Sequence, residues 1–410
     1  MTSQALPETI EGLLQTGLID PSFEAAWKTR GSPPGDMPAD VPTLKSILAS
    51  SLPSLQQKLA TTRPPNITEI EHHLSLTTGF NSRVLICHTT PPPDSPPAPG
   101  PIILLFHGGI HLFGYPEFDL PLARTLASAH NMNATVILPS TRKAPETPFP
   151  FMLHDSFAIL QLVAQDSLLP IRERKFLPPH CNPYDGFIVG GASSGANFAD
   201  VTAHLARDQQ LKPPLTGMFL ACGAYMDPER GVPVPYKELY LAREQNKDAP
   251  GVNGSFIRDF VEAVRPERGS RLWAPFEWGL HGGSAPEAVA VEEDEHDGDH
   301  GDRVKVAIAS GHMDMPPAYF QVCGMDVNRD DGLVYESVLR KECGVRTRVD
   351  LYLGMPHCWW DAYPELEASK KRMEDTIQGF RWLLGPSQTL QQIQAAARVL
   401  IPEEEHPTVS

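Results

Sequence analysis

The chain lacks the long uncharged apolar run that a membrane-spanning helix would need. Such a helix requires about 18 or more consecutive apolar residues, and no stretch of the 410-residue sequence approaches that length. The first fourteen residues have neither a basic start nor a long apolar stretch, so we expect no secretory signal there. The sequence therefore predicts a cytoplasmic protein without stable membrane insertion.

Positive charge is also scarce. Lys and Arg total 34 against 50 Asp and Glu, which gives a formal net charge of −16. Binding to nucleic acid requires cationic side chains that neutralise phosphates, and we find no local basic stripe, so we expect no nucleic-acid partner. Seven of the acidic residues fall between positions 292 and 302, and we interpret this run as a solvated surface loop. Capture of a hard cation is the alternative for this loop, through Asp297, Asp299, His296 and His300.

Paired cysteines are absent as well. The chain has six cysteines, widely scattered, with no Cys-x-x-Cys pair, and several lie inside apolar runs as small buried hydrophobes would. This pattern predicts reduced thiols, with no zinc site and no disulfide framework. The six are Cys87, Cys181, Cys222, Cys323, Cys343 and Cys358.

Two periodicities divide the chain. Helical spacing of leucine and isoleucine marks residues 43–61, after a first helical stretch at 9–28, whereas from residue 67 short apolar runs alternate with helical patterns. This alternation predicts an α/β fold with buried parallel strands, in which the first two strands form a paired edge. The predicted strands cover residues 67–76, 83–87, 102–106, 135–138, 187–190, 218–222, 319–323 and 349–353.

Residues 227–315 interrupt the alternation. Their first part is helix-like at 236–245 and 255–263, and the second part is rich in glycine and proline before the acidic run. We expect a lid insertion followed by a disordered acidic loop. The predicted organisation is an N-terminal helical cap segment at 1–62, a core in two parts at 63–226 and 316–385, this lid insertion at 227–315, and a peripheral tail at 386–410.

A nucleophile motif follows the predicted strand at 187–190. The segment Gly191-Ala192-Ser193-Ser194-Gly195 comes directly after this strand and opens a helix near Asn197. A G-x-S-x-G sequence at a sharp strand-to-helix turn holds its serine in a strained backbone conformation, and side chains at the flanking glycines would collide with neighbouring backbone. We therefore predict that Ser193 is a nucleophile.

A glycine pair precedes this motif in the chain. His107-Gly108-Gly109 stands just after the predicted strand at 102–106. Acyl transfer develops negative charge on an oxygen, which backbone N–H groups stabilise by several kcal/mol. The predicted oxyanion donors are the N–H groups of Gly108, Gly109 and Ser194.

An acid and a base follow the last two predicted strands. Asp326 stands after the strand at 319–323, and His357 after the strand at 349–353. The carboxyl ends of parallel strands meet at one edge of a sheet, beside the nucleophile turn. The chain order of serine, aspartate and histidine is the order that α/β-hydrolases use, so we predict a catalytic triad of Ser193, Asp326 and His357.

Together these motifs resemble the hormone-sensitive-lipase-like branch of the α/β-hydrolase superfamily, over roughly residues 67–384. The resemblance implies an eight-stranded, mostly parallel sheet with helices on both faces, a cap built from the N-terminal helices and an insertion, and ester hydrolysis without cofactor or metal. The proline-rich loops resemble those of fungal members, many of which act in natural-product pathways. Further matching segments are Arg142-Lys143-Ala144-Pro145-Glu146, Gly324-Met325-Asp326 with Arg329-Asp330-Asp331-Gly332, and Gly354-Met355-Pro356-His357.

The chain departs from the family pattern beside its nucleophile. Ile110 stands where a third glycine is usual, and Ala192 where an acidic residue is usual. Thr141 replaces an aromatic residue before the Arg142 segment, in which we interpret Glu146 as a buried structural anchor. These departures keep alternatives to hydrolysis open.

Three functions fit the sequence. The first is a serine carboxylesterase acting on a bulky apolar small molecule; the second is a catalyst of condensation, cyclisation or release on a carbonyl intermediate of fungal polyketide or peptide metabolism; the third is a ligand receptor on the same fold. The oligomeric state is not specified by any pattern. We expect the pocket to be lined by the N-terminal cap, by Leu112, Phe113 and Tyr115, by Trp273, Phe276 and Trp278, and by Trp359 and Trp360, for which core packing is the alternative.

Overall fold

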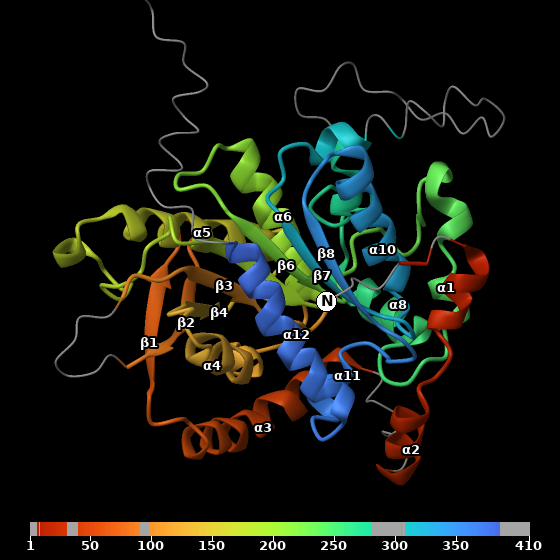
Figure 1. The fold of residues 1–410 in the computed structure, drawn as a ribbon, viewed down its shortest axis with the longest axis horizontal. Helices are drawn as coiled ribbons and strands as arrows, with labels where there is room; N and C mark the ends of the chain where they lie inside the picture. The colour runs from red at the N-terminus through yellow and green to blue at the C-terminus, as the bar shows by residue number, and fades with distance from the viewer. Residues whose placement is uncertain are drawn as a thin grey trace, which may run out of the picture.

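Eight strands form one sheet in the order β1-β2-β4-β3-β5-β6-β7-β8 (Figure 1). The computed structural model describes residues 6–7, 9–30, 40–90, 98–280, 305 and 308–385. Strands β1 and β2 and strands β2 and β4 pair antiparallel, and all other pairs are parallel. The predicted α/β class and mostly parallel sheet are confirmed, and every predicted strand end lies within two residues of the observed one. The strands are β1 (Ile67–Ser75), β2 (Asn81–Thr89), β3 (Ile102–Phe106), β4 (Thr135–Pro139), β5 (Phe187–Ala192), β6 (Gly217–Ala221), β7 (Ala318–Cys323) and β8 (Thr347–Tyr352).

Both faces of the sheet are buried. Along β3, Leu104 and Phe106 belong to one core cluster, and Ile103 and Leu105 belong to the other, because successive strand side chains point to opposite faces. In Figure 1, α4 and α12 lie in front of the sheet. Helices α5 (Phe151–Leu168), α6 (Ser194–Asp208) and α10 (Arg329–Ser337) pack in the first cluster, and α4 (Leu120–Ser128), α11 (Trp359–Ala362) and α12 (Glu367–Leu384) pack in the second.

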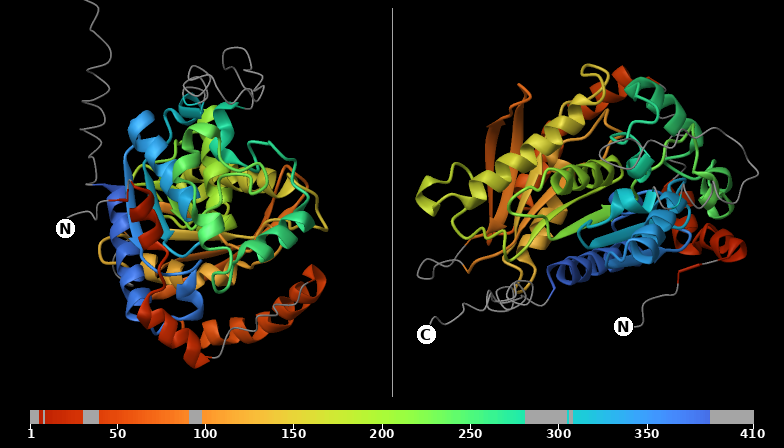
Figure 2. Two further views of the ribbon diagram at one scale, coloured as in Figure 1. Left: turned by 90° about the vertical axis from the view of Figure 1, so that its right-hand side faces the viewer. Right: turned by 90° about the horizontal axis from the view of Figure 1, so that it is seen from above.

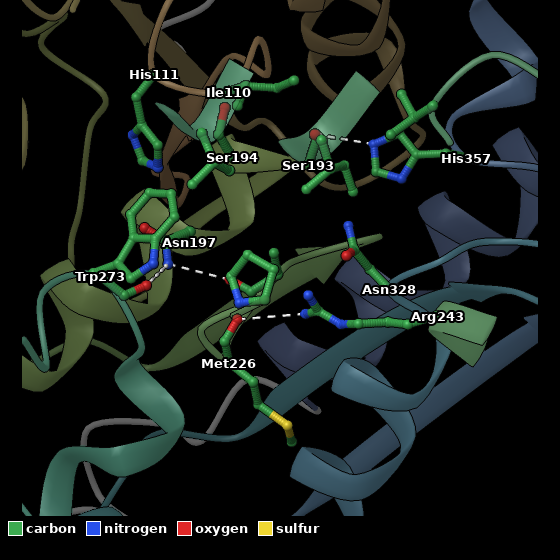
Figure 3. A pocket seen from close by; sticks show the side chains of 15 residues that line it. Ile110, His111, Ser193, Ser194, Asn197, Met226, Arg243, Trp273, Asn328 and His357 are labelled. Atoms are coloured by element: carbon green, nitrogen blue, oxygen red, sulfur yellow. Dashed lines mark hydrogen bonds between the residues drawn. The ribbon is translucent and has the colours of Figure 1, made fainter. Parts of the chain in front are cut away.

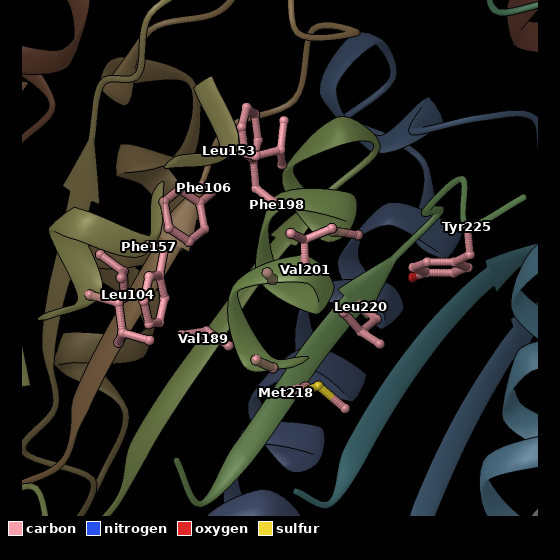
Figure 4. Packing of buried hydrophobic residues seen from close by; sticks show 14 of the residues in the cluster. Leu104, Phe106, Leu153, Phe157, Val189, Phe198, Val201, Met218, Leu220 and Tyr225 are labelled. Carbon is pink, nitrogen blue, oxygen red and sulfur yellow. The ribbon is translucent and has the colours of Figure 1, made fainter. Parts of the chain in front are cut away.

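The first cluster fixes α6 against the central strands. Figure 4 shows side chains of β3, β5 and β6 packed against those of α5 and α6. Phe106 and Phe198 approach with ring centroids 5.7 Å apart, and Val201 and Leu153 are fully buried beside them. Burying such side chains contributes about 1.5–3 kcal/mol each. This packing holds the amino end of α6, where the nucleophile motif stands.

Three N-terminal helices lie outside the sheet. They are α1 (Ile10–Thr16), α2 (Pro21–Arg30) and α3 (Val41–Thr61). The Asp40 carboxylate accepts the Thr43 N–H at 2.7 Å and so caps α3. Lys45 on this helix forms an ion pair with Glu146. Glu146 therefore anchors a loop as predicted, but its side chain is exposed rather than buried, because its partner comes from a surface helix.

The described part of the insertion contains α7 (Ala242–Gln245), α8 (Gly254–Val264) and the 3₁₀ turns η3 (Val234–Leu239) and η4 (Pro275–Leu280). The helix predicted at 255–263 is thus present as α8. The helix predicted at 236–245 is wrong, since the chain divides into η3 and α7. The break arises because the buried carboxylate of Asp330 accepts the N–H groups of Leu241 and Ala242, each at 2.6 Å.

The insertion and the N-terminal helices gather at the same end of the molecule (Figure 2). Gln245 of α7 donates to the carbonyl of Leu14 in α1 at 2.7 Å. The predicted acidic loop and the predicted tail lie outside the described residues. Among the helices that the structure describes, none combines the length and the apolar character needed to cross a bilayer.

Arg329 connects α1 and α7 to the core. Its substitution therefore tests how these two helices are held. Its fully buried guanidinium pairs with Asp330 at 2.6 Å and donates to the carbonyl of Leu13 at 3.0 Å and to Gln245 at 2.6 Å. Arg329→Leu leaves the Asp330 charge unpaired in the interior, so we expect a loss of about 3–5 kcal/mol in the free energy of unfolding, measured by urea denaturation.

Arg172→Leu is the matched control for this substitution. The Arg172 side chain is 86% exposed and, among the described residues, pairs only with the adjacent Glu173, so its removal should change stability by less than about 1 kcal/mol. Equal effects of the two substitutions would contradict the anchoring role of Arg329.

Candidate active site

Ser193 stands at a sharp turn between β5 and α6. Its backbone has φ 56° and ψ −127°, a left-handed conformation that non-glycine residues seldom adopt. The turn is compressed against β3, because a Cβ atom on Gly191 would lie 2.4 Å from the carbonyl oxygen of Phe106, and a Cβ on Gly195 would lie 2.0 Å from the same oxygen. Only glycine fits at both positions, which explains the spacing of the motif.

The structure brings together the three residues of the predicted triad. Ser193 Oγ lies 2.9 Å from His357 Nε2, and His357 Nδ1 lies 2.7 Å from Asp326 Oδ2. Asp326 follows β7 and His357 follows β8, so the adjacent ends of parallel strands position both. The Asn246 amide of the insertion donates to the carbonyl of Asp326 at 2.8 Å, and the N–H of Asn328 donates to Asp326 Oδ1 at 2.9 Å. The aspartate is thereby held from both sides.

Burial and charge act in opposite directions on this pair. Burial by itself would lower the pKa of His357, but the charge of Asp326 and the hydrogen bond to it raise that pKa to about 9. Burial also raises the pKa of Asp326, while His357 acts to lower it. The carboxylate therefore favours the protonated imidazole, which is the form that arises when the histidine takes a proton from Ser193.

The glycine pair of the loop after β3 lies against the nucleophile. A Cβ on Gly108 would meet the Ala192 carbonyl at 3.0 Å and Ser193 Cβ at 3.3 Å. Gly109 has φ 122°, and a Cβ there would lie 2.7 Å from the Phe113 carbonyl. Among the described residues, neither glycine N–H donates to another group. Ser194 is the first residue of α6, where helical N–H groups have no partner within the helix. Gly108 and Ser194 therefore lie next to Ser193, and their role as oxyanion donors, with Gly109, stays a prediction.

Ile110 keeps the loop in a strained conformation without the usual glycine. Its φ is 53°, and the next residue, His111, has φ 58°. Such a left-handed conformation costs about 1–2 kcal/mol for a side chain with a Cβ. The His111 carbonyl accepts the N–H of Ala144 at 3.0 Å, and His107 Nδ1 donates to the Gly108 carbonyl at 2.8 Å. These bonds hold the loop, and burial lowers the pKa of His107 to about 3, so this ring stays neutral.

A pocket opens beside Ser193 and His357 (Figure 3). Arg243 and Asn328 lie on one side of the pocket, and His111, Ser194 and Asn197 lie on the other. The apolar lining includes Ile110, Met226, Val252, Ile257, Val261 and Trp273. Most of it comes from the insertion, as expected for a lid.

The predicted lining residues lie elsewhere, with the exception of Trp273. Leu112 is fully buried, and Phe113 packs edge-on against Phe260 with centroids 5.5 Å apart. Trp359 packs against Tyr352 at 5.0 Å in the second core cluster. Leu112, Phe113 and Trp359 pack in the core and therefore do not reach the pocket. Residues of the insertion line the pocket instead. Tyr115, Phe276, Trp278, Trp360 and the described residues of α1–α3 are likewise absent from the lining.

Sequence reasoning missed Arg243. Its Nη2 donates to Asp331 at 3.1 Å and to the Met226 carbonyl at 3.4 Å, and its Nε donates to Tyr240 at 2.6 Å. Nη1 donates to no described residue, and Figure 3 shows the guanidinium reaching between Met226 and Asn328. No motif marks this arginine in the insertion. The only sequence signal was indirect, since its partner Asp331 lies in a segment that matches the family.

Asn328 was missed for a different reason. It lies two residues after Asp326, and no sequence motif distinguishes it from other residues of that loop. Its side-chain amide lines the pocket and makes no hydrogen bond with another described residue. Asn328 and Arg243 therefore present free hydrogen-bonding groups on the same side of the pocket.

Two overlapping groups of described residues have metal-ligand atoms within 4.8 Å of one another. One group contains Cys222, His357 and Cys358, and the other contains Cys222, Cys323 and Asp326. Each includes a triad residue, so a metal there would compete with the bond between His357 and Asp326. The alternative metal site in the acidic loop, at Asp297, Asp299, His296 and His300, lies outside the described residues.

Comparison with known proteins gives matches over the same region. Residues 103–275 match the family model described as the alpha/beta hydrolase fold. A Schizosaccharomyces pombe AB hydrolase superfamily protein is 33% identical over 247 residues, which are 59% of this chain and 60% of that protein. The versiconal hemiacetal acetate esterase of Dothistroma septosporum is 28% identical over 287 residues, or 70% and 74% of the two chains.

A solved structure agrees with the fold over nearly the whole chain. The crystal structure of vibralactone cyclase superposes with a TM-score of 0.74 and covers 95% of this chain and 100% of its own, at 23% sequence identity. The matched family segment and the shared architecture show that the chain has the α/β-hydrolase fold.

Proposed function

We propose that the protein is a serine hydrolase that cleaves a carboxylic ester of a small molecule through an acyl-enzyme on Ser193. The observation that carries this proposal is the continuous chain of contacts from Ser193 Oγ through His357 to Asp326. Next to it lie N–H groups that have no acceptor among the described residues. The similarity to a protein named versiconal hemiacetal acetate esterase supports it.

In the acylation step, His357 Nε2 accepts the Ser193 proton while Oγ bonds to the ester carbonyl carbon. The N–H groups of Gly108, Gly109 and Ser194 stabilise the oxyanion. The imidazolium then gives its proton to the leaving alcohol oxygen as the ester C–O bond breaks. Water repeats these steps on the acyl-enzyme, which releases the acid and returns the proton to Ser193.

The pocket lining supports a largely apolar substrate that carries one further acceptor oxygen. The apolar residues of the lining fit the carbon skeleton, and the free Nη1 of Arg243 and the Asn328 amide fit the oxygen. Because Arg243 is already paired with the buried Asp331, the pair has no net charge. A neutral carbonyl or hydroxyl oxygen therefore suits this position better than a carboxylate.

The same polar groups support a second candidate, a non-hydrolytic reaction on a carbonyl intermediate. If Arg243 and Asn328 hold a hydroxyl or enol of the substrate, that group can attack the acyl carbon in place of water and release a cyclised product. Turnover in ¹⁸O-labelled water distinguishes the two reactions, since hydrolysis places one ¹⁸O atom in the acid and cyclisation places none. A receptor role without catalysis would leave the assembled triad unexplained.

Reaction with a fluorophosphonate tests the nucleophile. We expect one adduct, located on Ser193 by intact mass and peptide mapping, because the probe needs an activated serine and an oxyanion hole. Ser193→Ala should abolish the adduct and lower ester turnover by about 10⁴-fold or more, with an unchanged melting curve. Ser194→Ala is the matched control and should retain the adduct, since the proposal uses only the Ser194 N–H. Labelling of folded Ser193→Ala protein would contradict the assignment.

The pH dependence of this labelling tests His357. The histidine acts as a base only when neutral, and its folded-state pKa is raised to about 9. The labelling rate should therefore rise about tenfold per pH unit below that value and level off above it. Asp326→Asn removes the charge that raises the pKa, so the midpoint should move down toward that of free histidine and the plateau should fall. A rate that is flat from pH 6 to 9 in the unaltered protein would contradict a raised pKa.

A matched pair of esters tests Arg243 and Asn328. The two substrates have the same bulky acyl chain, one with a ketone oxygen and one without. Arg243→Lys keeps a charge beside Asp331 but loses the planar fork, and we expect kcat/KM for the keto ester to fall by about tenfold or more, the value of a hydrogen bond to a charged group. Asn328→Ala should act in the same direction. An equal fall for both esters would show that the two residues only support the structure.

A further inference from the structure

Three of the cysteines that the sequence scatters meet beneath the triad. Cys222 follows β6, Cys323 ends β7, and Cys358 follows His357. The sulfur atoms of Cys222 and Cys323 lie 3.0 Å apart, and Cys222, Cys358 and His357 have side-chain atoms within 4.8 Å of one another. All three cysteines are free thiols, and the mechanism proposed above uses none of them.

The backbone turns Cys222 toward Cys323. Leu220 and Ala221 belong to opposite core clusters, so strand alternation would return residue 222 to the side of Leu220. Instead, Cys222 has φ 50° and lies in the same cluster as Ala221 and Cys323. A left-handed conformation is unfavourable for a residue with a Cβ, so the surrounding fold must hold the Cys222 backbone in this conformation.

The surroundings of the two thiols differ. Burial raises the pKa of the Cys222 thiol, but hydrogen bonds from the thiols of Cys323 and Cys358, the positive charge of His357 and the Cys358 N–H together lower it well below the usual value. Burial and the neighbouring Cys222 raise the pKa of Cys323 well above its usual value. A thiolate next to a thiol is the arrangement in which peroxide oxidation leads to a disulfide.

We propose that Cys222 and Cys323 form an oxidative modification site, at which a hydroperoxide joins them in a reversible disulfide beneath Asp326 and His357. Sulfur of Cys222 attacks one peroxide oxygen, the O–O bond breaks, and a sulfenic acid and one water form with hydrogen peroxide as the oxidant. Sulfur of Cys323 then bonds to Cys222 sulfur, the S–O bond breaks, and a second water leaves. The two thiols lose two electrons and two protons, and a dithiol reductant reverses the change.

The strand geometry accommodates this bond. Ala221 pairs with Gln321 in the parallel ladder, so Cys222 and Cys323 are offset by one residue on neighbouring strands. A strand spacing of about 4.8 Å and a rise of about 3.3 Å per residue give a Cα–Cα distance of about 6 Å, which is within the range of natural disulfides. A shared metal fits less well, because the remaining ligands, His357 and Asp326, are already bonded to each other.

The disulfide would act on the site through two short connections. Cys323 precedes Asp326 by three residues, and Cys222 contacts the residue after His357. Closing the sulfur atoms to about 2.05 Å draws the end of β6 toward the loop that holds Asp326. We expect the oxidised protein to react with fluorophosphonate at least about tenfold more slowly than the reduced protein, because small displacements of catalytic groups have effects of this order. This last effect rests on the proposed function, whereas formation of the bond does not.

The test uses the full chain treated with hydrogen peroxide and then with an alkylating agent. We expect the intact mass to fall by two hydrogen atoms, non-reducing peptide mapping to show the Cys222–Cys323 crosslink, and dithiothreitol to restore both the mass and the rate of Ser193 labelling. Cys323→Ser should prevent the crosslink and leave a sulfenic acid on Cys222 that a cyclic diketone traps. Cys181→Ser is the matched control, because Cys181 is equally buried but bonds to Thr135 far from the cluster, and it should form the crosslink normally.

Stepwise addition of oxygen without a crosslink, a crosslink that uses other cysteines, or an unchanged mass at a peroxide concentration that oxidises a free thiol peptide would each overturn the proposal. Failure of the hydrolase assignment looks different. In that case the Cys222–Cys323 crosslink forms, while the reduced protein gives no adduct on Ser193.

Discussion

The close approach of β3 to the turn after β5 is the contact on which the site depends. The Phe106 carbonyl lies so near Gly191 and Gly195 that neither position has room for a Cβ. Because β3 continues into Gly108, the same approach places the oxyanion loop against Ser193. A looser packing would leave serine and loop intact but separate the nucleophile from the donors. Gly191 and Gly195 thus allow the nucleophile turn to pack closely against the end of β3, although β3 lies far earlier in the chain.

The adjacent residues Arg329, Asp330 and Asp331 connect the core to the elements outside the sheet. Arg329 bonds to α1, Asp330 holds the start of α7, and Asp331 holds Arg243 and the backbone of Met226. All three are buried at the amino end of α10, just after the loop that carries Asp326. Helix α1, the insertion and Arg243 of the pocket therefore take their positions from the element that follows the loop of Asp326. Because buried residues of α10 hold Arg243 and Met226, the pocket should lose its shape only when the core itself unfolds.

The sequence was sufficient for the sheet and the triad but insufficient for the pocket. Short continuous apolar runs and strand-to-helix motifs are local properties, so all eight strands and the relation of Ser193, Asp326 and His357 could be predicted. The pocket depends on which apolar side chains remain after the core is filled, and Leu112 and Trp359 have the same apolar character whether they face a core or a ligand. Likewise, the break between η3 and α7 comes from Asp330, a carboxylate about ninety residues later in the chain. No local pattern contains that information.

Cys222 is a free, buried thiol, as the sequence predicts, but its surroundings give it a property that the sequence does not reveal. Scattered cysteines in apolar runs are usually inert fillers, and burial alone would keep this thiol protonated. Its difference from Cys87 or Cys181 lies in what the fold places around it: two thiols, an N–H group and the ring of His357. For Cys87 burial dominates and raises the pKa to about 12, and for Cys181 it raises the pKa to about 11. The pKa of a buried cysteine therefore depends on whether hydrogen bonds to its sulfur outweigh the effect of burial. For Cys222, those hydrogen bonds exist because the ends of β6, β7 and β8 converge.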